Sequence, residues 1–557
     1  MKKIVLLAIA AGVSLAASAQ TWQDALQFSQ SEYWGTARSM GMGNALTAIG
    51  ADPGSLVFNP AGSAVASYSQ FFLSPGLAIS SVFAQGTALD GAEPIGLGDP
   101  VTTGYVRMKL PSMGFVINMD SGRRTGFKRM SFGILAHVTA DYTSRFNASG
   151  VNADNSYAAS VASSAMGYSP EDLGMSDWYG KSAPAWTDMT AYRSNMFNSL
   201  SGYPGSYVAL TEVVDADGNI RLAAPVRQGY GEQTTGSKTD LLINFSANFS
   251  DRLYLGANLG ITSINYHLSE YWKESPENPS EFPLIYYDDG TKATFESLRM
   301  KYNYRLNGGG VYLKAGMLWR PVAGLRLGAA IQTPTLMTLN ERYGYSGEVS
   351  LSGMKPASAE SPEDEWSYAF VNPFRVNAGL AYSIGNVAVV SADYEMVNYG
   401  TARFRERANT GFGTEDSFRY VNEDIRDFLG ISHILRAGLE VKPIPALSLR
   451  AGYNYTTAAE HAWWDGYSVV KYSAAELASM AQHAFSAGIG YSFGSFYVDA
   501  AARFRMLPAE YVVPYYYYYA PDETQYWNKV VDEDFLTPEV ASRRRMTDVI
   551  LTLGWRF

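Results

Sequence analysis

Residues 435–455 read LRAGLEVKPIPALSLRAGYNY. Apolar residues occupy every second position on both sides of Pro443, and charged, polar or glycine residues lie between them. Successive side chains of a β-strand point to opposite faces, so each half of this stretch predicts a strand with one apolar and one polar face. The short link around Pro443 predicts that the two strands form a hairpin.

The same alternation recurs along most of the chain. An apolar row at every second position is also found in Leu241–Phe249, Leu325–Ile331 and Phe485–Tyr491. Counted in this way, the sequence predicts fourteen strand-like segments. They span 70–84, 103–118, 128–146, 237–249, 252–272, 296–319, 324–351, 367–384, 386–407, 432–443, 446–459, 480–494, 495–511 and 544–557.

The composition excludes several classes of protein. Of the 557 residues, 47% are hydrophobic but only 17% are charged, and the mean hydropathy is −0.12. A soluble chain would carry about 25% charged residues, whereas a helical membrane protein would be clearly hydrophobic. The absence of cysteine excludes disulfide scaffolds, thiolate metal sites, cysteine nucleophiles and a lipid anchor on cysteine. A net charge of −10 gives no footprint for nucleic acid.

Alternation alone also fits a soluble β-sandwich, so the lengths of the connections decide between the two classes. Short turns at 250–251, 320–323, 443–446 and around Gly494 alternate with long connections. An antiparallel outer-membrane barrel has this asymmetry, with short periplasmic turns and long external loops. We therefore predict an all-β, fourteen-stranded transmembrane barrel with partly helical outer loops. The long connections span 85–102, 147–236, 273–295, 352–366, 408–431, 460–479 and 512–543.

The two ends of the chain agree with export to an outer membrane. Residues 1–19 combine Lys2 and Lys3 with an apolar run and a small-residue site before Gln20, and this pattern predicts a cleaved signal peptide. The last strand carries an outward apolar row that ends in Phe557 and resembles the signal read by the barrel assembly machinery. We expect three parts: a signal peptide (1–19), an N-terminal hatch (20–69) and the barrel (70–557).

The segment before the first strand does not alternate. It contains a stretch from Ala37 to Ala45 with glycines at 41 and 43, then Asp52 and the motif Asn59-Pro60-Ala61-Gly62. Gly41–Gly43 is not a phosphate loop, because no strand precedes it and no Gly-Lys-Ser/Thr follows. On these residues, together with the strand number and the terminal Phe557, the chain resembles the FadL family of outer-membrane long-chain fatty acid transporters.

The resemblance implies a mechanism as well as a fold. In that family, external loops capture a hydrophobic compound and pass it to a site inside a barrel that the hatch closes. Movement of the hatch and a kinked, non-pairing strand then release the compound sideways into the membrane. The predicted lumen is charged, and a sideways exit would spare an apolar molecule that passage.

Two sets of residues are candidates for ligand contact. Exposed aromatic residues often mark a binding surface, although packing within the loops is the alternative. One interior arginine would meet the carboxylate of a fatty acid. The candidate capture residues are Trp178, Tyr179, Trp186, Trp463 and Trp464, and the candidate carboxylate ligands are Arg375, Arg436 and Arg450.

Other partners follow from the location. Arg543, Arg544 and Arg545 enter the last strand from the outside and could pair with lipopolysaccharide phosphates; otherwise they are solvated rim charges. We expect no cofactor and no metal, since the five histidines are scattered. No Gly-x-Ser-x-Gly elbow occurs, so we expect a non-enzymatic barrel that acts as a monomer.

Three other functions stay open. The barrel could be a surface platform for a secretion or assembly partner. It could also take up another hydrophobic ligand, such as an aromatic compound, or haem through His461. A general porin is disfavoured by the hatch, and a receptor with about 22 strands and a large plug would need a longer chain.

Overall fold

A computed structural model describes residues 20–87, 94–180, 183–200, 202–203, 205–216, 218–286, 290–408, 411–412, 416–464, 468–515 and 537–557. The predicted signal peptide, residues 1–19, lies outside the described residues. Among the described residues, no helix is long and apolar enough to cross a membrane.

The strands form one closed sheet, because β1 pairs with β2 on one side and with β28 on the other. The predicted barrel of fourteen antiparallel strands is confirmed. Four of the fourteen are bent and consist of two segments. In order they are β1 (Gln70–Thr87), β2 (Val101–Asp120), β3 with β4 (Phe127–Asp141, Ser144–Asn152), β9 (Val226–Phe249), β10 (Leu253–Pro276), β13 (Phe295–Trp319), β14 with β15 (Leu325–Gln332, Leu336–Leu351), β17 with β18 (Asp364–Val371, Arg375–Ile384), β19 with β20 (Ala388–Asn398, Arg403–Ala408), β22 (Ile431–Ile444), β23 (Leu447–Thr456), β26 (Gln482–Phe493), β27 (Phe496–Val512) and β28 (Glu539–Arg556).

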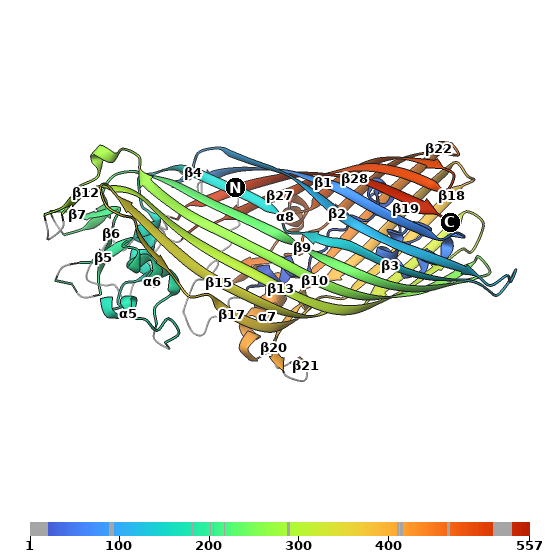
Figure 1. The fold of residues 1–557 in the computed structure, drawn as a ribbon, viewed down its shortest axis with the longest axis horizontal. Coiled ribbons are helices and arrows are strands. Elements are labelled where there is room, and N and C mark those ends of the chain that lie inside the picture. Colours follow the sequence, from blue (N-terminus) through green and yellow to red (C-terminus); the bar gives the residue numbers. More distant parts are fainter. Residues whose placement is uncertain are drawn as a thin grey trace.

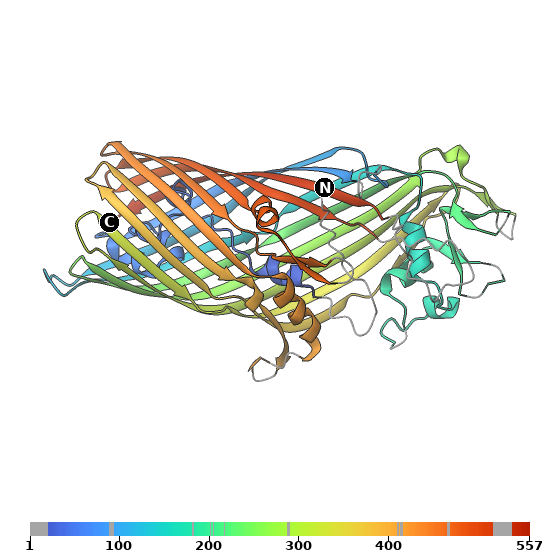
Figure 2. The same ribbon diagram turned by 180° about the vertical axis from the view of Figure 1, so that it is seen from behind.

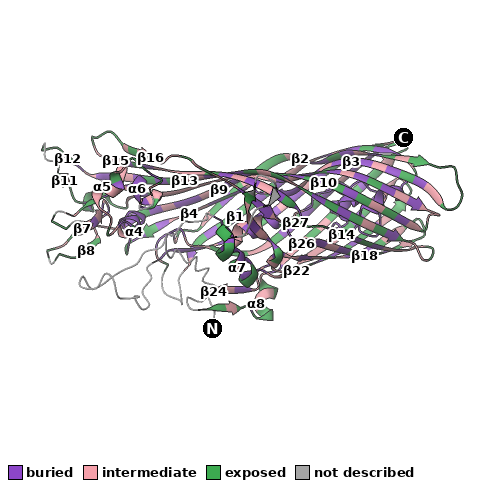
Figure 3. Ribbon diagram, turned by 90° about the horizontal axis from the view of Figure 1, so that it is seen from below, coloured by how far each residue is buried: buried purple, intermediate pink, exposed green. Residues whose placement is uncertain are grey.

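The alternating pattern of the sequence is also the burial pattern of the wall. Along β22, Leu435 and Leu439 are 50% and 40% exposed on the outer face, whereas Arg436 and Glu440 are 4% and 2% exposed on the inner face. Figure 3 shows the same alternation along other strands of the barrel. The apolar row of each strand therefore faces outward and the polar row faces the lumen.

The two ends of the barrel differ. One end, called here the turn end, carries the short connections and the C-terminus (Figure 1). The opposite loop end carries the long connections, which are partly helical as predicted. The loop elements are α4 (Tyr157–Ser164), α5 (Pro170–Gly174), α6 (Trp186–Arg193), β5 (Phe197–Ser199), β6 (Tyr207–Ala209), β7 (Glu212–Val214), β8 (Ile220–Leu222), β11 (Ile285–Tyr286), β12 (Lys292–Ala293) and β16 (Ala357–Glu360).

The wall is taller on one side than on the other. Strands β9, β10 and β13 have 24, 24 and 25 residues, whereas β22, β23 and β26 have 14, 10 and 12. Shorter loop elements attach to the short wall about halfway along the barrel (Figure 2). They are β21 (Gly411–Phe412), α7 (Arg419–Phe428), β24 (Ala462–Trp464), β25 (Val469–Lys471) and α8 (Ala474–Ser479).

The chain before β1 folds inside the barrel and is called the hatch (residues 20–69). Its helices are α1 (Trp22–Ser29), α2 (Ala37–Gly41) and α3 (Ser55–Phe58), followed by a 3-10 turn at Pro60–Val65. Most of the hatch fills the turn end, and α1 reaches halfway up the lumen (Figures 1 and 2). Local chemistry sets the start of α1, because Thr21 and Asp24 form a capping box.

Candidate functional site

The second half of the hatch, Gly41–Gly62, is called the hatch core and lies directly on glycines of the wall. A Cβ atom on Gly452 would stand 2.0 Å from the Gly43 nitrogen, and one on Gly256 would stand 2.5 Å from the Ala61 nitrogen. Any side chain at these positions would push the hatch off the wall. The glycines that meet the hatch core in this way form the glycine belt: Gly256, Gly316, Gly328, Gly379, Gly438 and Gly452.

The predicted hatch motif ties the hatch core together and to the wall. The Asn59 side-chain amide donates to the carbonyl oxygens of Thr47 (2.8 Å) and Met317 (2.9 Å), and its Oδ1 accepts from the Ala61 nitrogen. Pro60 begins the 3-10 turn, where its missing N–H costs nothing. A Cβ on Gly62 would stand 2.4 Å from Ser55 Oγ. The motif therefore sets the conformation of the hatch core.

Cations of the wall hold the first half of the hatch by its carbonyl groups. Lys238 Nζ donates to the carbonyl oxygens of Phe28 (2.8 Å) and Gln30 (2.6 Å), and Arg375 Nη2 donates to that of Ser29 (2.7 Å). These three carbonyls end helix α1, where the helix dipole favours positive charge. The position of α1 thus depends on two side chains rather than on close backbone contact.

The three arginines predicted to meet a carboxylate already have carboxylate partners. Arg375 and Arg436 both pair with Glu395, at 3.0 and 2.6 Å. Arg450 pairs with Glu440 and with Asp499, each at 2.7 Å. Each arginine is at least 90% buried at the level of the hatch. Binding of a ligand carboxylate there stays a prediction, and the ligand would have to displace or share a partner.

Beyond the hatch core, toward the loop end, the lumen is lined by aromatic side chains that the sequence analysis missed. Helix α1 lies among them: Phe28 packs edge-on against Tyr266 (5.8 Å between centroids), and Trp22 stacks on Phe428 of α7 (5.4 Å). The aromatic chamber is defined as the buried rings Tyr142, Tyr266, Tyr304, Tyr368, Phe370, Phe404 and Phe418, which surround α1. Helix α1 therefore occupies an apolar space inside a charged barrel.

One stretch of β2 forms a backbone ladder on one side only. Ser112–Asp120 of β2 pair with Arg129–His137 of β3, but Val101–Lys109 pair only with β1 on their other side, and Leu110 and Pro111 lie at a register shift. All residues of this region are described, and no ladder joins 101–111 to β3 or β4. Pro111 has no N–H, and the β3–β9 ladder has a bulge between Val138 and Ala140, directly after the last β3 residue that pairs with β2. We call 101–111 with the facing 138–143 the unpaired wall stretch.

Side chains close this stretch instead of backbone bonds. Lys109 pairs with Asp141, and Tyr105 and Arg107 donate to the carbonyl oxygen and the hydroxyl of Thr143. Such contacts can break without disturbing a β-ladder.

The hatch lies directly behind the unpaired wall stretch. The Glu32 nitrogen donates to the Thr139 carbonyl oxygen (2.5 Å), and Ser112 Oγ donates to the Gly35 carbonyl oxygen (2.6 Å). Lys109 Nζ lies 4.4 Å from the centroid of the Trp34 ring. The segment that connects α1 to the hatch core therefore covers the inner side of the stretch.

The predicted capture aromatics form two separate groups. Trp186 contacts Trp178 and Tyr179, with centroids 5.8 and 5.3 Å apart. Trp178 is 8% exposed and belongs to the packing of the loop, whereas Tyr179 is 61% exposed. Trp463 and Trp464 are half-buried in the β24 hairpin on the short wall. A role in capture stays a prediction for both groups.

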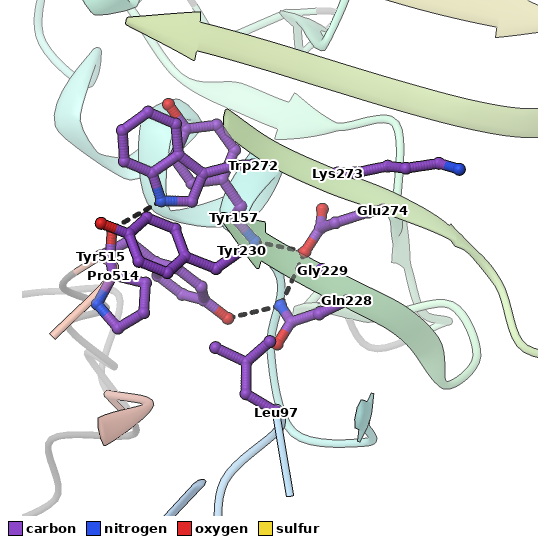
Figure 4. Close-up of a pocket in the computed structure, with 10 residues that line it drawn as sticks. All are labelled: Leu97, Tyr157, Gln228, Gly229, Tyr230, Trp272, Lys273, Glu274, Pro514 and Tyr515. Carbon is purple, nitrogen blue, oxygen red and sulfur yellow. Dashed lines mark hydrogen bonds between the residues drawn. The ribbon is translucent and has the colours of Figure 1, made fainter. Parts of the chain in front are cut away.

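A small pocket at the loop end is filled by the protein itself. Trp272 stacks on Tyr157 (5.2 Å), and the Gln228 amide donates to Glu274 Oε1 (2.7 Å) and to the hydroxyl of Tyr515 (2.5 Å), as Figure 4 shows. The space left is of the order of one water molecule. This network attaches the loops to the tall wall and is too small for a fatty acid.

The described residues hold no group of three or more histidine or acidic side chains arranged for a metal ion. His461, the residue considered for haem, is half-buried near the end of α7, where its backbone nitrogen donates to the Phe428 carbonyl oxygen.

Comparison with known proteins supports the fold assignment. No family model matches the chain, and no curated protein matches it. A FadL homologue from Pseudomonas aeruginosa has a similar solved structure, with a TM-score of 0.50, 12% identity, and coverage of 95% of this chain and 99% of that one. The chain has the FadL fold. The structure of the toluene transporter TodX of Pseudomonas putida has a TM-score of 0.45, 13% identity, and coverage of 95% of this chain and 99% of that one. The predicted resemblance is thus confirmed at the level of the fold.

Proposed function

We propose that the protein is a passive channel for hydrophobic small molecules in a Gram-negative outer membrane, with the loop end outside. The observation that carries this proposal is the unpaired wall stretch, which side chains close and the hatch covers. An apolar molecule that leaves there enters the bilayer core without crossing the charged turn end. The FadL fold supports the same assignment.

Only part of the hatch has to move. The hatch core lies on the glycine belt, whereas the end of α1 is held by wall side chains, and Gln30–Gly35 by wall side chains and one backbone bond to Thr139. A ligand that enters the aromatic chamber competes with α1 for the same apolar surface. Displacement of α1 would pull on Glu32–Gly35 and uncover the unpaired wall stretch.

A long-chain fatty acid is the simplest ligand for this path. Of the three candidate arginines, we propose that Arg375 meets the carboxylate, because one of its partners is the Ser29 carbonyl oxygen at the end of the movable helix. Arg436 and Arg450 have carboxylate partners on the wall strands β19 and β22, not on the movable helix. Tyr179, Trp186, Trp463 and Trp464 would supply the first, external contact, with the buried Trp178 packed against Trp186.

The last strand indicates how the barrel is assembled. We propose that the outward row of β28, which ends in Trp555 and Phe557, is read by the barrel assembly machinery and that the barrel works as a monomer. The C-terminus is well placed for closure, because Phe557 and Ser69 exchange two backbone hydrogen bonds of 2.9 and 3.0 Å.

Uptake of a fluorescent long-chain fatty acid by proteoliposomes tests the function. We expect uptake by the intact barrel and a several-fold rise when Lys109→Ala is combined with Asp141→Ala, because the pair closes the unpaired wall stretch. Lys128 and Asp251 form a comparable pair at the turn end, so Lys128→Ala with Asp251→Ala is the matched control and should leave uptake unchanged. A surface platform would show no uptake with any of the three proteins.

A further inference from the structure

The outer face of β28 changes character along its length. From the turn end it carries Trp555, three aliphatic residues and Thr547, and then Arg545 and Arg543. Both arginines are exposed on this outer face. Arg544 between them is half-buried on the inner face and lies 3.8 Å from Glu510. The arginine run that looked uniform in the sequence is thus divided between the two faces of the wall.

The height of the two arginines places them at one edge of the membrane. Strands rise about 3.3 Å per residue and tilt by roughly 40° in such barrels, so the ten residues from Trp555 to Arg545 climb roughly 25 Å. This equals the height of the apolar band of an outer-membrane barrel. Tryptophan favours the interface at one side of the band. Arg545 and Arg543 therefore lie at the headgroup level of the opposite leaflet.

No acidic side chain of the described residues pairs with either guanidinium group. In the sheet register, Phe83 and Ala509 flank Arg543, and Ser81 and Met506 flank Arg545. Among the described residues, neither arginine has an ion pair or a side-chain hydrogen bond. The inward arginines of the same region differ, since Arg503 and Arg505 both pair with Asp548. Two cations with no ion-pair partner in the described part of the chain thus stand on an outer face that is apolar below them.

An anion that carries acyl chains fits these conditions. Phosphate accepts charge-assisted bonds from guanidinium groups. The acyl chains of a lipid that carries the phosphate would lie along the apolar residues of β28 and β1, below the arginines. Two outward residues on one strand stand about 7 Å apart, so both arginines can reach one headgroup.

We propose that Arg543 and Arg545 bind the phosphate of an acylated glycolipid headgroup, that of lipopolysaccharide, in the outer leaflet. The inference rests on the proposed outer-membrane location with the loop end outside. It does not depend on transport, because these residues face away from the lumen.

The test measures lipid A binding to the full-length barrel in phosphatidylcholine vesicles. Arg543→Gln with Arg545→Gln should weaken binding about thirtyfold, the effect of losing two arginines near an anionic surface. Arg123→Gln with Arg124→Gln is the matched control, since this exposed arginine pair lies in the β2–β3 turn at the opposite end. Heat-modifiable migration on a gel verifies that each variant folds.

Two further arms identify the source of the phosphate. Lipid A stripped of its phosphates should bind the intact barrel as weakly as lipid A binds the double variant, and inorganic phosphate alone should compete poorly. Equal binding by the double variant and the intact barrel would overturn the proposal. Strong binding of inorganic phosphate would also overturn it, because the acyl chains would then contribute nothing. Fatty acid uptake should be the same in the double variant, so this proposal and the transport proposal fail separately.

Discussion

The two halves of the hatch are attached to the same barrel by different means. The hatch core, Gly41–Gly62, packs directly against glycines of the wall. A side chain introduced at one of these glycines would therefore displace the hatch core. The first half, Gln20–Gly35, is held through α1 by Lys238 and Arg375 and through the aromatic chamber by apolar contacts. A segment packed closely against the backbone of the wall is held in place. A segment held by the ends of long side chains can be released when those side chains move. The difference indicates where opening begins.

The largest expected effect comes from the glycine belt. Gly452→Val would place a side chain where a Cβ alone would stand 2.0 Å from the Gly43 nitrogen. Backbone cannot yield as a flexible side chain can, so we expect the hatch core to leave its seat and the barrel to admit large hydrophilic antibiotics. Gly229→Val on β9 is the control, because a Cβ there would meet no atom of the described residues within 4 Å. Antibiotic susceptibility of cells that express each variant measures the difference.

A smaller effect is expected when one lysine contact to each half of the hatch is removed, and it compares the two halves directly. Lys238→Met removes both bonds to the end of α1, at about 1.5–3 kcal/mol for a hydrogen bond to a charged group. Hydrogen exchange should then rise in Trp22–Ser29 and stay slow in the hatch core. Lys314→Met removes a similar bond to the Val57 carbonyl oxygen, but the glycine belt still holds that region. Equal loss of protection in both variants would contradict a divided hatch.

The smallest expected effect concerns the loops and depends on pH. Burial raises the pKa of Asp188 in α6 to about 7, although the Ser164 hydroxyl donates to it and opposes the shift. A raised carboxyl pKa stabilises the folded loop below its unfolded value near 4, and this stability is lost as the pH rises toward 7. Protease resistance of the 153–225 loop should therefore fall from pH 4 to pH 7 in the native protein. In Asp188→Asn the fall should be smaller, and what remains comes from Glu212 and Glu274, whose carboxyl pKa values burial also raises.

Much of the barrel could be predicted because each strand carries its own two-face pattern. Outward Leu435 and inward Arg436 follow from alternation alone, and Asn59–Gly62 mark the hatch by position. The partners of the inward charges could not be predicted, since the Arg375–Glu395–Arg436 cluster depends on the register of three strands. Without that register, the three candidate arginines could not be distinguished.

Other features were visible in the sequence, but the sequence does not show which element each of them contacts. Pro111 inside a strand signals an interrupted ladder, yet only the structure identifies the strand that β2 fails to pair with. Gly256, Gly316 and Gly452 at inward positions signal a close backbone approach, and the hatch core is the element that approaches. The rings of the aromatic chamber come from several strands and a loop, so no local pattern predicts them.

The central claim is that the wall opens between β2 and β3 while the adjoining ladder stays closed. The chain has no cysteine, so two introduced cysteines carry the only spin labels. One pair, Met108→Cys with Val138→Cys, spans the unpaired wall stretch from outside, and the control pair, Met113→Cys with Ala136→Cys, joins residues that are ladder partners. On addition of oleate, pulsed electron paramagnetic resonance should show a longer distance for the first pair and no change for the second. Unchanged distances for both pairs in a barrel that takes up oleate would contradict the account.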